Sequence, residues 1–253
     1  MISIQKGAAP PALVRRGDKH ALELCAAYDA GRAIAIIEGI YQSAKPHLEI
    51  CHHGKCCYCE TLIDDHKPYA YSEVEHWRPK SIYYWLAYSW ENMFLSCTFC
   101  NKEKGNQFPL RDQSTRATHH GMSIDEETPE ILKPDADRDP SQHFKWRGDT
   151  PEGITCEGRR TIEVLNLDSP KHQRKRHLVE FQLKHAAYMS FMSSAYPSKQ
   201  QDAEAARKLL EEAMRPERPY SAMIAAYLAA NPLPDPAKAN KSMGQLKEES
   251  GLF

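Results

Sequence analysis

The chain has 253 residues and a mass of 28.8 kDa, which is enough for one large domain or for a small catalytic unit with helical additions. Its 33 lysines and arginines nearly balance 34 acidic residues, so the formal net charge of -1 excludes a global electrostatic signature of nucleic-acid binding. Any contact with a nucleic acid must therefore come from local basic patches.

The first residues and the cysteines indicate the compartment. Residues 1–14 contain two prolines and lack the apolar core of a secretory signal, and no stretch of about 18 apolar residues occurs in the chain. We therefore expect a soluble, cytoplasmic protein. Its eight cysteines would stay reduced in the cytoplasm. Close pairs of cysteines therefore favour metal binding over disulfide bonds.

Residues 1–50 are predicted to form an N-terminal helical segment. Apolar side chains recur at helical spacing between residues 18 and 41, and Asp18 is a suitable N-cap. Gly31 interrupts the pattern, which indicates one or two packed helices. The apolar positions are Leu22, Cys25, Ile36, Ile37 and Ile40.

The rest of the chain divides at about residue 112. Residues 51–112 are rich in cysteine, histidine and aromatic residues with little helical period, which is typical of a small fold held by metal. Residues 113–253 are predicted to be a loop-rich connection and a C-terminal helical region, ending in a polar tail. The predicted helices run from Ser169-Pro170 to about residue 195, over 201–214 and over 220–230.

Two C-x-x-C pairs predict a zinc site. Their four thiolates would fill the tetrahedral positions of one Zn²⁺, which leaves no place for water and gives the ion a structural role. Reduced core cysteines and a redox pair are the weaker alternatives. The predicted ligands are Cys56, Cys59, Cys97 and Cys100.

Other possible zinc ligands lie next to the first cysteine pair, so the ligand at that corner of the site could be a residue one position away. Cys57 lies inside the pair, and Cys51, His52 and His53 come just before it. The two remaining cysteines, at positions 25 and 156, are expected to be ordinary buried residues.

Glu75 and His76 follow a β-prone stretch and precede a loop marked by Pro79. Adjacent residues on a strand point to opposite faces, but a bend at the strand end would let Glu75 bind a divalent cation while His76 takes a proton from water. An isolated Glu-His pair is usually a surface feature. The order of carboxylate and histidine, Asn92, the second cysteine pair and Asn101 favours catalysis.

This order resembles the HNH endonucleases, which have a ββα-metal motif. The motifs are most similar to those of the PtuB family, the HNH nuclease subunits of Septu-type and retron-associated anti-phage defence systems. The resemblance covers about a quarter of the chain. The matching motifs are Cys56-x-x-Cys59-Glu60, Glu75-His76-Trp77-Arg78-Pro79-Lys80, Trp85-Leu86-Ala87-Tyr88 and Cys97-x-x-Cys100-Asn101-x-x-Lys104-Gly105-x-x-Phe108-Pro109-Leu110.

The resemblance implies a role for each matched residue. His76 would be the general base, Glu75 and Asn101 would bind the catalytic cation, and the amide of Asn92 would position the loop that carries the histidine. Many HNH motifs have Asp at the position of Glu75 and His at the position of Asn101. The identity of the cation is therefore open, with Mg²⁺ or Mn²⁺ favoured by oxygen ligands.

The resemblance also implies a fold, a substrate and a partner. The expected fold is α+β and mostly helical, with an HNH ββα-metal core and a four-cysteine zinc knuckle between N- and C-terminal helices. The expected activity is hydrolysis of phosphodiester bonds, with DNA favoured over RNA as the substrate. The chain would be a subunit that works with the ATPase PtuA. Candidate contacts to substrate phosphate are Arg78, Lys80, Lys102 and Lys104.

Two other classes of function fit parts of the pattern. A zinc-stabilised nucleic-acid-binding or adaptor module without catalysis would need only the cysteines. A metallohydrolase acting on a small molecule would need an open zinc site, to which His52, His53 or His66 would contribute. Retention of Glu75 and His76 together with Asn101 argues against the binding module.

Overall fold

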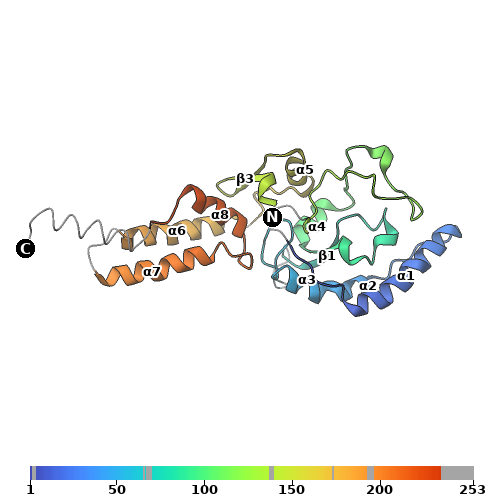
Figure 1. The fold of residues 1–253 in the computed structure, drawn as a ribbon, viewed down its shortest axis with the longest axis horizontal. Coiled ribbons are helices and arrows are strands. Elements are labelled where there is room, and N and C mark those ends of the chain that lie inside the picture. The colour runs from blue at the N-terminus through green and yellow to red at the C-terminus, as the bar shows by residue number, and fades with distance from the viewer. Residues whose placement is uncertain are drawn as a thin grey trace, which may run out of the picture.

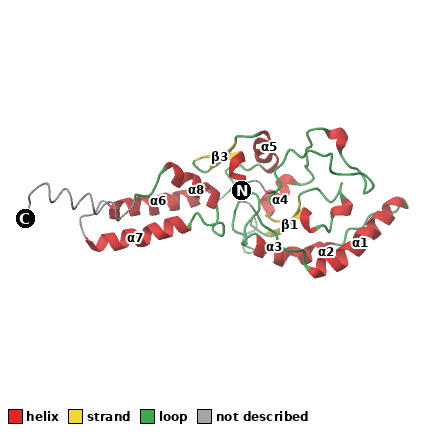
Figure 2. Cartoon of the chain, in the orientation of Figure 1, coloured by secondary structure: helices red, strands yellow, loops and turns green. Residues whose placement is uncertain are grey.

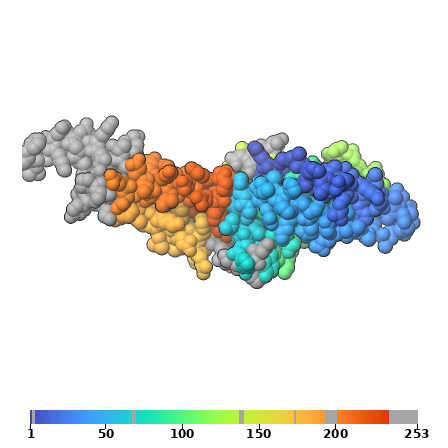
Figure 3. All heavy atoms as spheres, turned by 90° about the horizontal axis from the view of Figure 1, so that it is seen from below, coloured from blue at the N-terminus to red at the C-terminus, as the bar shows by residue number. Residues whose placement is uncertain are grey.

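The computed structural model of the chain is mostly helical, with two small antiparallel hairpins (Figures 1 and 2). The molecule is elongated, with α1 at one end and helices α6 to α8 at the other (Figure 3). This confirms the predicted α+β class. None of the helices within the described ranges is both long and apolar enough to cross a bilayer. The structure describes residues 1, 4–64, 66, 70–136, 140–172, 174–192 and 197–234.

Helix α1 (Pro11–Asp29) begins earlier than predicted. Pro11 occupies its first turn, where the fixed φ of proline suits a helix and its missing N–H costs nothing. Asp18, predicted as the N-cap, therefore lies inside the helix, and that prediction is wrong. The helix packs closely on the body of the molecule at Gly17, where a Cβ atom would lie only 2.8 Å from the Cβ of Tyr88.

Two short helices follow, α2 (Glu38–Tyr41) and α3 (Lys45–Cys51). The chain reaches them after a turn in which Gly31 has a left-handed φ of 64°, a conformation that glycine adopts without strain. These helices bury an apolar face against the first hairpin. The buried cluster includes Leu13, Ile40, Leu48, Val74, Met93 and Leu95.

The central unit is a β-hairpin followed by a helix. Strand β1 (Ser72–His76) pairs antiparallel with β2 (Met93–Cys97). In the register of this hairpin Glu75 lies opposite Phe94, and His76 lies opposite Met93. Helix α4 (Thr98–Lys104) follows β2 without a connecting loop and contacts both strands. Helix α4 begins inside the second cysteine pair and carries Asn101.

A second hairpin leads into a helix that the sequence analysis did not predict, and this helix packs on α4. Strands β3 (Phe144–Arg147) and β4 (Thr150–Gly153) lead into α5 (Cys156–Leu165), which contacts α4. The signals for α5 were present in the sequence, because Thr155 caps its start by accepting a hydrogen bond from the Gly158 amide at 3.0 Å. Its many charged residues hid the apolar face.

The C-terminal helices form a bundle with an apolar core of its own. They are α6 (Arg174–Met192), α7 (Pro197–Glu212) and α8 (Ser221–Ala230). The predicted start of α6 at Ser169-Pro170 is wrong: residues 168–172 form turns, and α6 begins at Arg174, whose guanidinium donates to the carbonyl of Asp149 at 2.9 Å. The predicted end near residue 195 and the polar tail lie outside the described residues. The bundle core includes Leu178, Phe181, Tyr188, Leu210 and Ile224.

The bundle is attached to the central unit through Glu60. This buried carboxylate accepts hydrogen bonds from the Ser221 hydroxyl at 3.0 Å and the Ala222 amide at 3.3 Å, both in the first turn of α8. Its own backbone has a left-handed φ of 61°, which is costly for a residue with a side chain. The bonds to α8 offset that cost, so Glu60 joins the first cysteine turn to the C-terminal bundle.

His52, at the end of α3, gives a prediction about acid stability. It is 1% exposed and packs on Phe94, and burial lowers its pKa to about 3 from an ordinary value of 6.5. Below pH 6.5 the unfolded chain binds a proton at His52 that the folded chain does not bind. The free energy of unfolding therefore falls as pH falls, by ~1.4 kcal/mol per pH unit between about 6.5 and about 3 for one such group.

We expect His52→Phe to remove this contribution and to keep the ring volume. Urea unfolding at pH 7 and pH 5 should show that the variant loses ~2 kcal/mol less stability than the wild type over this interval. The substitution His53→Phe, at an exposed neighbour, is the control. Identical acid losses in the wild type and the His52 variant would contradict the prediction.

Candidate active site and zinc knuckle

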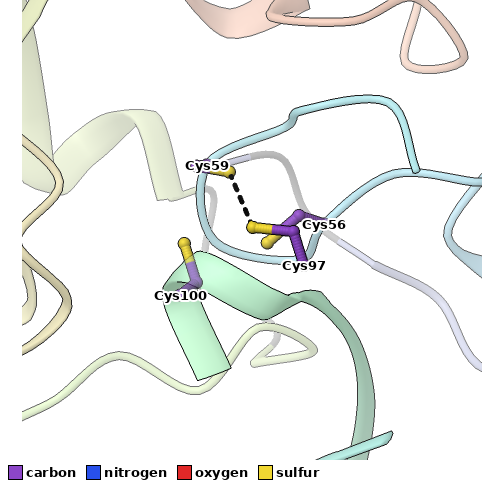
Figure 4. Close-up of side chains that lie close together, drawn as sticks. All are labelled: Cys56, Cys59, Cys97 and Cys100. Atoms are coloured by element: carbon purple, nitrogen blue, oxygen red, sulfur yellow. Dashed lines mark hydrogen bonds between the residues drawn. The ribbon is translucent and has the colours of Figure 1, made fainter. Parts of the chain in front are cut away.

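The four predicted zinc ligands come together in one buried cluster (Figure 4). All four Sγ atoms lie within 4.8 Å of one another, and those of Cys59 and Cys97 are 3.8 Å apart. A tetrahedron with Zn–S bonds of about 2.3 Å has edges of about 3.8 Å. The donor set and its spacing therefore fit a structural zinc, as is typical of HNH folds. The cluster comprises Cys56, Cys59, Cys97 and Cys100.

Backbone pairing brings the two cysteine turns together. The Cys57 amide donates to the carbonyl of Leu95 at 2.9 Å, which aligns the first turn beside β2. Cys97 ends β2, and Cys100 lies one helical turn further along α4. Cys57 is buried but does not belong to the cluster, and His52, His53 and His66 do not belong to it either.

The four thiols of the cluster differ in how readily they ionise. Burial opposes ionisation of Cys56, but hydrogen bonds with the surrounding thiols lower its pKa well below the ordinary value, whereas hydrogen bonds with Cys56 and Cys59 raise the pKa of Cys100 well above it. Thr61 Oγ1 lies 3.1 Å from Cys59 Sγ. The two cysteines that were expected to be ordinary buried residues differ from that expectation: Cys25 is half-buried, and Cys156 is exposed at the start of α5.

A polar pocket of about 200 Å³ lies at the end of β1, on the side of α4. It brings together Glu75, His76 and Asn101, three of the residues that the sequence singled out. Helix α2, which the sequence did not connect with the site, forms another wall. The polar lining consists of Glu38, Tyr41, Gln42, Glu73, Glu75, His76, Lys80, Asn101 and Asn106.

Glu75 and His76 reach this pocket from opposite faces of β1, as adjacent strand residues must. The Glu75 carboxylate is 2% exposed and pairs with Lys104 Nζ at 2.6 Å, while the Tyr58 hydroxyl donates to it at 3.4 Å. Burial raises the pKa of Glu75, and the nearby Lys104 cation acts in the opposite direction. The carboxylate is thus held rigidly at the pocket floor.

The imidazole of His76 has a defined orientation. Its Nε2 lies 2.9 Å from the carbonyl oxygen of Ala87, and a carbonyl oxygen can only accept a hydrogen bond. Nε2 therefore carries the hydrogen, which leaves Nδ1 with the lone pair. Burial, together with the positive charges of Lys80 and Lys104, lowers the pKa of His76 to about 3, so the ring is neutral at physiological pH.

Asn92 fixes the loop that follows His76. Its Oδ1 accepts from the Arg78 amide at 2.8 Å, and its Nδ2 donates to the carbonyl oxygens of Arg78 at 3.0 Å and Leu86 at 3.2 Å. The side chain is 4% exposed, so no water replaces these bonds readily. One amide thus holds both ends of the connection between β1 and the turn at residues 84–86.

We expect Asn92→Ala to lower the free energy of unfolding by ~1–3 kcal/mol, because buried backbone groups lose their partners. Amide exchange at Arg78 should accelerate as the loop opens. Asn106→Ala changes an exposed asparagine on the rim of the same pocket and is the matched control. Equal effects of the two substitutions would show that Asn92 does not hold the loop.

The predicted phosphate contacts divide into two groups. Lys80 lines the pocket and Lys102 is exposed, so both are accessible to a substrate. Lys104 is fully buried between Glu75 and the carbonyl of His76, to which it donates at 2.9 Å, and Arg78 is buried in an ion pair with Glu127. The side chain of Lys104 is fully buried and that of Arg78 is 9% exposed, so the structure does not present either of them to a substrate, and their contact with phosphate stays a prediction.

Comparison with known proteins agrees with this geometry. Residues 56–107, which contain both cysteine pairs and the β1–β2–α4 unit, match the family described as HNH endonuclease. These residues form an HNH endonuclease domain. The HNH domain thus covers the zinc knuckle and the catalytic candidates, whereas helices α1 to α3 and α5 to α8 lie outside it.

Two curated relatives extend the similarity beyond the HNH domain. Septu protein PtuB of Bacillus mycoides (strain KBAB4) is 35% identical over 144 residues, covering 50% of this chain and 47% of the relative. Septu protein PtuB of Bacillus thuringiensis is 32% identical over 128 residues, covering 49% and 42%. The chain is homologous to these proteins over about half its length, and it spans about half the length of the relatives that it matches.

Proposed function

We propose that the chain is a metal-dependent HNH endonuclease that hydrolyses phosphodiester bonds, with DNA as the favoured substrate. The observation that carries the proposal is the meeting of Glu75, His76 and Asn101 in one polar pocket of an HNH domain. Two are oxygen ligands for a hard cation, and the third is a neutral base beside them. This combination supports metal-assisted hydrolysis of a phosphodiester.

Glu75 and Asn101 would hold the catalytic cation, Mg²⁺ or Mn²⁺. When bound, such an ion stabilises the charge that develops on the phosphate and on the leaving oxygen. The carboxylate is preorganised by Lys104 and Tyr58, and the half-buried Asn101 lies on the accessible side of α4. Glu73 lines the same pocket two residues earlier on β1 and adds negative charge there.

His76 would act as the general base. Its Nδ1 takes a proton from the attacking water, while the water oxygen forms a bond to phosphorus and the bond from phosphorus to the 3′-oxygen breaks. The carbonyl of Ala87 retains the hydrogen on Nε2 and so keeps Nδ1 available. The leaving 3′-oxygen would take a proton from solvent water, so the products would be a 5′-phosphate and a 3′-hydroxyl. Lys80 and Lys102 would contact backbone phosphates without reading sequence.

The four-cysteine zinc knuckle would have a structural role, separate from that of the catalytic cation. The four buried thiolates would hold one Zn²⁺ with no open position, so this ion would stabilise the fold without activating water. We further propose that the chain consists of an N-terminal helical segment (1–50), the nuclease core (51–112) and a loop-rich connection with a C-terminal helical region (113–253), and that the protein is cytoplasmic.

We also propose a role in a Septu-type anti-phage complex, in which an ATPase subunit, PtuA, would be the partner. The names of the two Bacillus relatives support this context. The helices outside the HNH domain would supply surface for the partner. The trigger of cleavage would then come from the assembly.

The ion pair of Glu75 and Lys104 favours a second function, that of a catalytically inactive nucleic-acid-binding or adaptor module. A carboxylate that is already neutralised by a buried lysine binds a cation less strongly than a free one. In that case zinc would still fold the domain, and nucleic acid would bind without being cleaved.

Cleavage of plasmid DNA and of total RNA distinguishes these functions. The full chain is assayed alone and with its ATPase partner, with Mg²⁺, Mn²⁺ or a chelator of these ions. We expect cleavage with either cation, none with chelator, and none by Glu75→Ala, which should still bind DNA. Binding without cleavage of either nucleic acid, under every condition and with the partner present, would support the inactive module.

A further inference from the structure

Tyr41 of α2 lies against the proposed general base although it is far from it in sequence and outside the HNH domain. Its ring centroid is 4.9 Å from that of His76, with an interplanar angle of 86°. Tyr41 is 7% exposed and lines the pocket that holds Glu75 and Asn101. The contact is therefore an edge-to-face ring pair at the wall of the candidate active site.

Within the described part of the chain, the imidazole has one hydrogen bond to the protein, from Nε2 to the carbonyl of Ala87. A single hydrogen bond fixes one ring nitrogen and leaves the orientation of the ring to packing. The ring of Tyr41, which lies edge-to-face with the imidazole, is one of the groups that set this orientation. Lys80 Nζ, 5.2 Å from the centroid of the Tyr41 ring, covers the tyrosine in turn.

The position of Tyr41 is itself fixed. Its neighbour Ile40 is buried in the cluster that contains Val74 and Met93 of the hairpin. The backbone amide of Ile37 donates to the Tyr88 hydroxyl at 2.7 Å, which anchors the start of α2. Helix α2 is thus a rigid support for whatever its last residue touches.

The charges around the tyrosine keep it neutral. Burial, followed by the negative charges of Glu38 and Glu73, raises the pKa of Tyr41 to about 12. The hydroxyl stays protonated at physiological pH and does not act as a base. The contact with His76 is made by the ring of the tyrosine.

We propose that Tyr41 is a positioning residue for His76, whose ring holds the imidazole so that Nδ1 faces the pocket. The inference rests on the proposed function, because it gives the N-terminal helical segment a place in the nuclease site. It also predicts that the HNH domain without residues 1–50 lacks one wall of its active site.

The test compares Tyr41→Phe, which keeps the ring, with Tyr41→Leu, which removes it. The first readout is ¹⁵N NMR of the His76 imidazole at fixed pH, which needs neither substrate nor catalytic cation. We expect one sharp Nε2-protonated form in the wild type and in Tyr41→Phe. In Tyr41→Leu we expect broadened signals or a mixture of the two tautomers.

The second readout is single-turnover cleavage, in which Tyr41→Leu should be about 10–100-fold slower and Tyr41→Phe close to the wild type. Tyr71→Leu, at a tyrosine that is 41% exposed beside β1, is the control. Should Tyr41→Leu fail to fold, Tyr41→Met gives the same comparison. An unchanged imidazole spectrum in the folded variant overturns the inference. If the wild type cleaved nothing, the proposed function would be refuted. An altered imidazole spectrum in Tyr41→Leu would in that case still support the positioning of His76 by Tyr41.

Discussion

His76→Ala is expected to lower the rate of phosphodiester cleavage by about 10²–10⁴-fold, the usual contribution of a positioned general base. The variant should keep its fold, because among the described residues the imidazole has only the Ala87 carbonyl as a hydrogen-bond partner and leaves a small gap beside Tyr41. Zinc content and far-UV circular dichroism on the same samples verify that the loss is chemical. The readout is the single-turnover rate with saturating Mg²⁺.

The control for this experiment is His53→Ala, which changes an exposed histidine near the zinc knuckle. It should cleave at the rate of the wild type. If His76→Ala retained full activity with zinc bound, His76 would not be the base, and the cleavage would arise from another group or from a contaminating nuclease.

Replacing a knuckle cysteine should have the largest effect on stability. Cys59→Ser is expected to lose zinc and cooperative unfolding together, because structural zinc contributes ~10–16 kcal/mol of apparent binding free energy in small domains. The four thiols belong to the apolar cluster under β2 and α5, so their separation would expose that core. Glu60, the next residue, would also release its bonds to the start of α8.

The matched control is Cys156→Ser, at the exposed cysteine that is outside the cluster. It should bind one zinc per chain and unfold as the wild type does. A folded Cys59→Ser protein with full zinc content would show that the ligand at this corner is a different residue.

The site could be predicted from the sequence where spacing alone brings residues together. Two C-x-x-C turns place four thiols around one point in many folds, and the order of Glu75, His76 and Asn101 places them on one hairpin and its helix. In these cases the geometry is local. The structure gathers the four thiols in one cluster and places Glu75, His76 and Asn101 around one pocket, while the catalytic roles of these three residues stay predictions.

Residue type alone could not tell which charged side chains face the substrate. Lys104 and Arg78 look like phosphate contacts, but the fold buries them against Glu75 and Glu127. Their carboxylate partners are 29 and 49 positions away in the sequence, and local spacing does not reveal pairs at such distances. Tyr41 was missed for the same reason, because only tertiary packing brings α2 to the pocket.

Helix boundaries were misplaced where two start signals compete. Asp18 is a good N-cap, yet Pro11 starts the helix about two turns earlier. Ser169-Pro170 also has the form of a helix start, yet α6 begins only at Arg174. The guanidinium of Arg174 donates hydrogen bonds to the carbonyl oxygens of Asp149 and Leu167. Local propensity gives way to tertiary hydrogen bonds in such places.

The most direct test of two metals with separate tasks is to measure bound zinc and plasmid cleavage on one sample of the full chain, dialysed free of loosely bound ions. We predict one zinc per chain, no cleavage before addition of Mg²⁺ or Mn²⁺, and cleavage after it with the zinc content unchanged. Cleavage that follows the zinc content without any added cation would contradict this account, because the zinc would then be the catalytic ion.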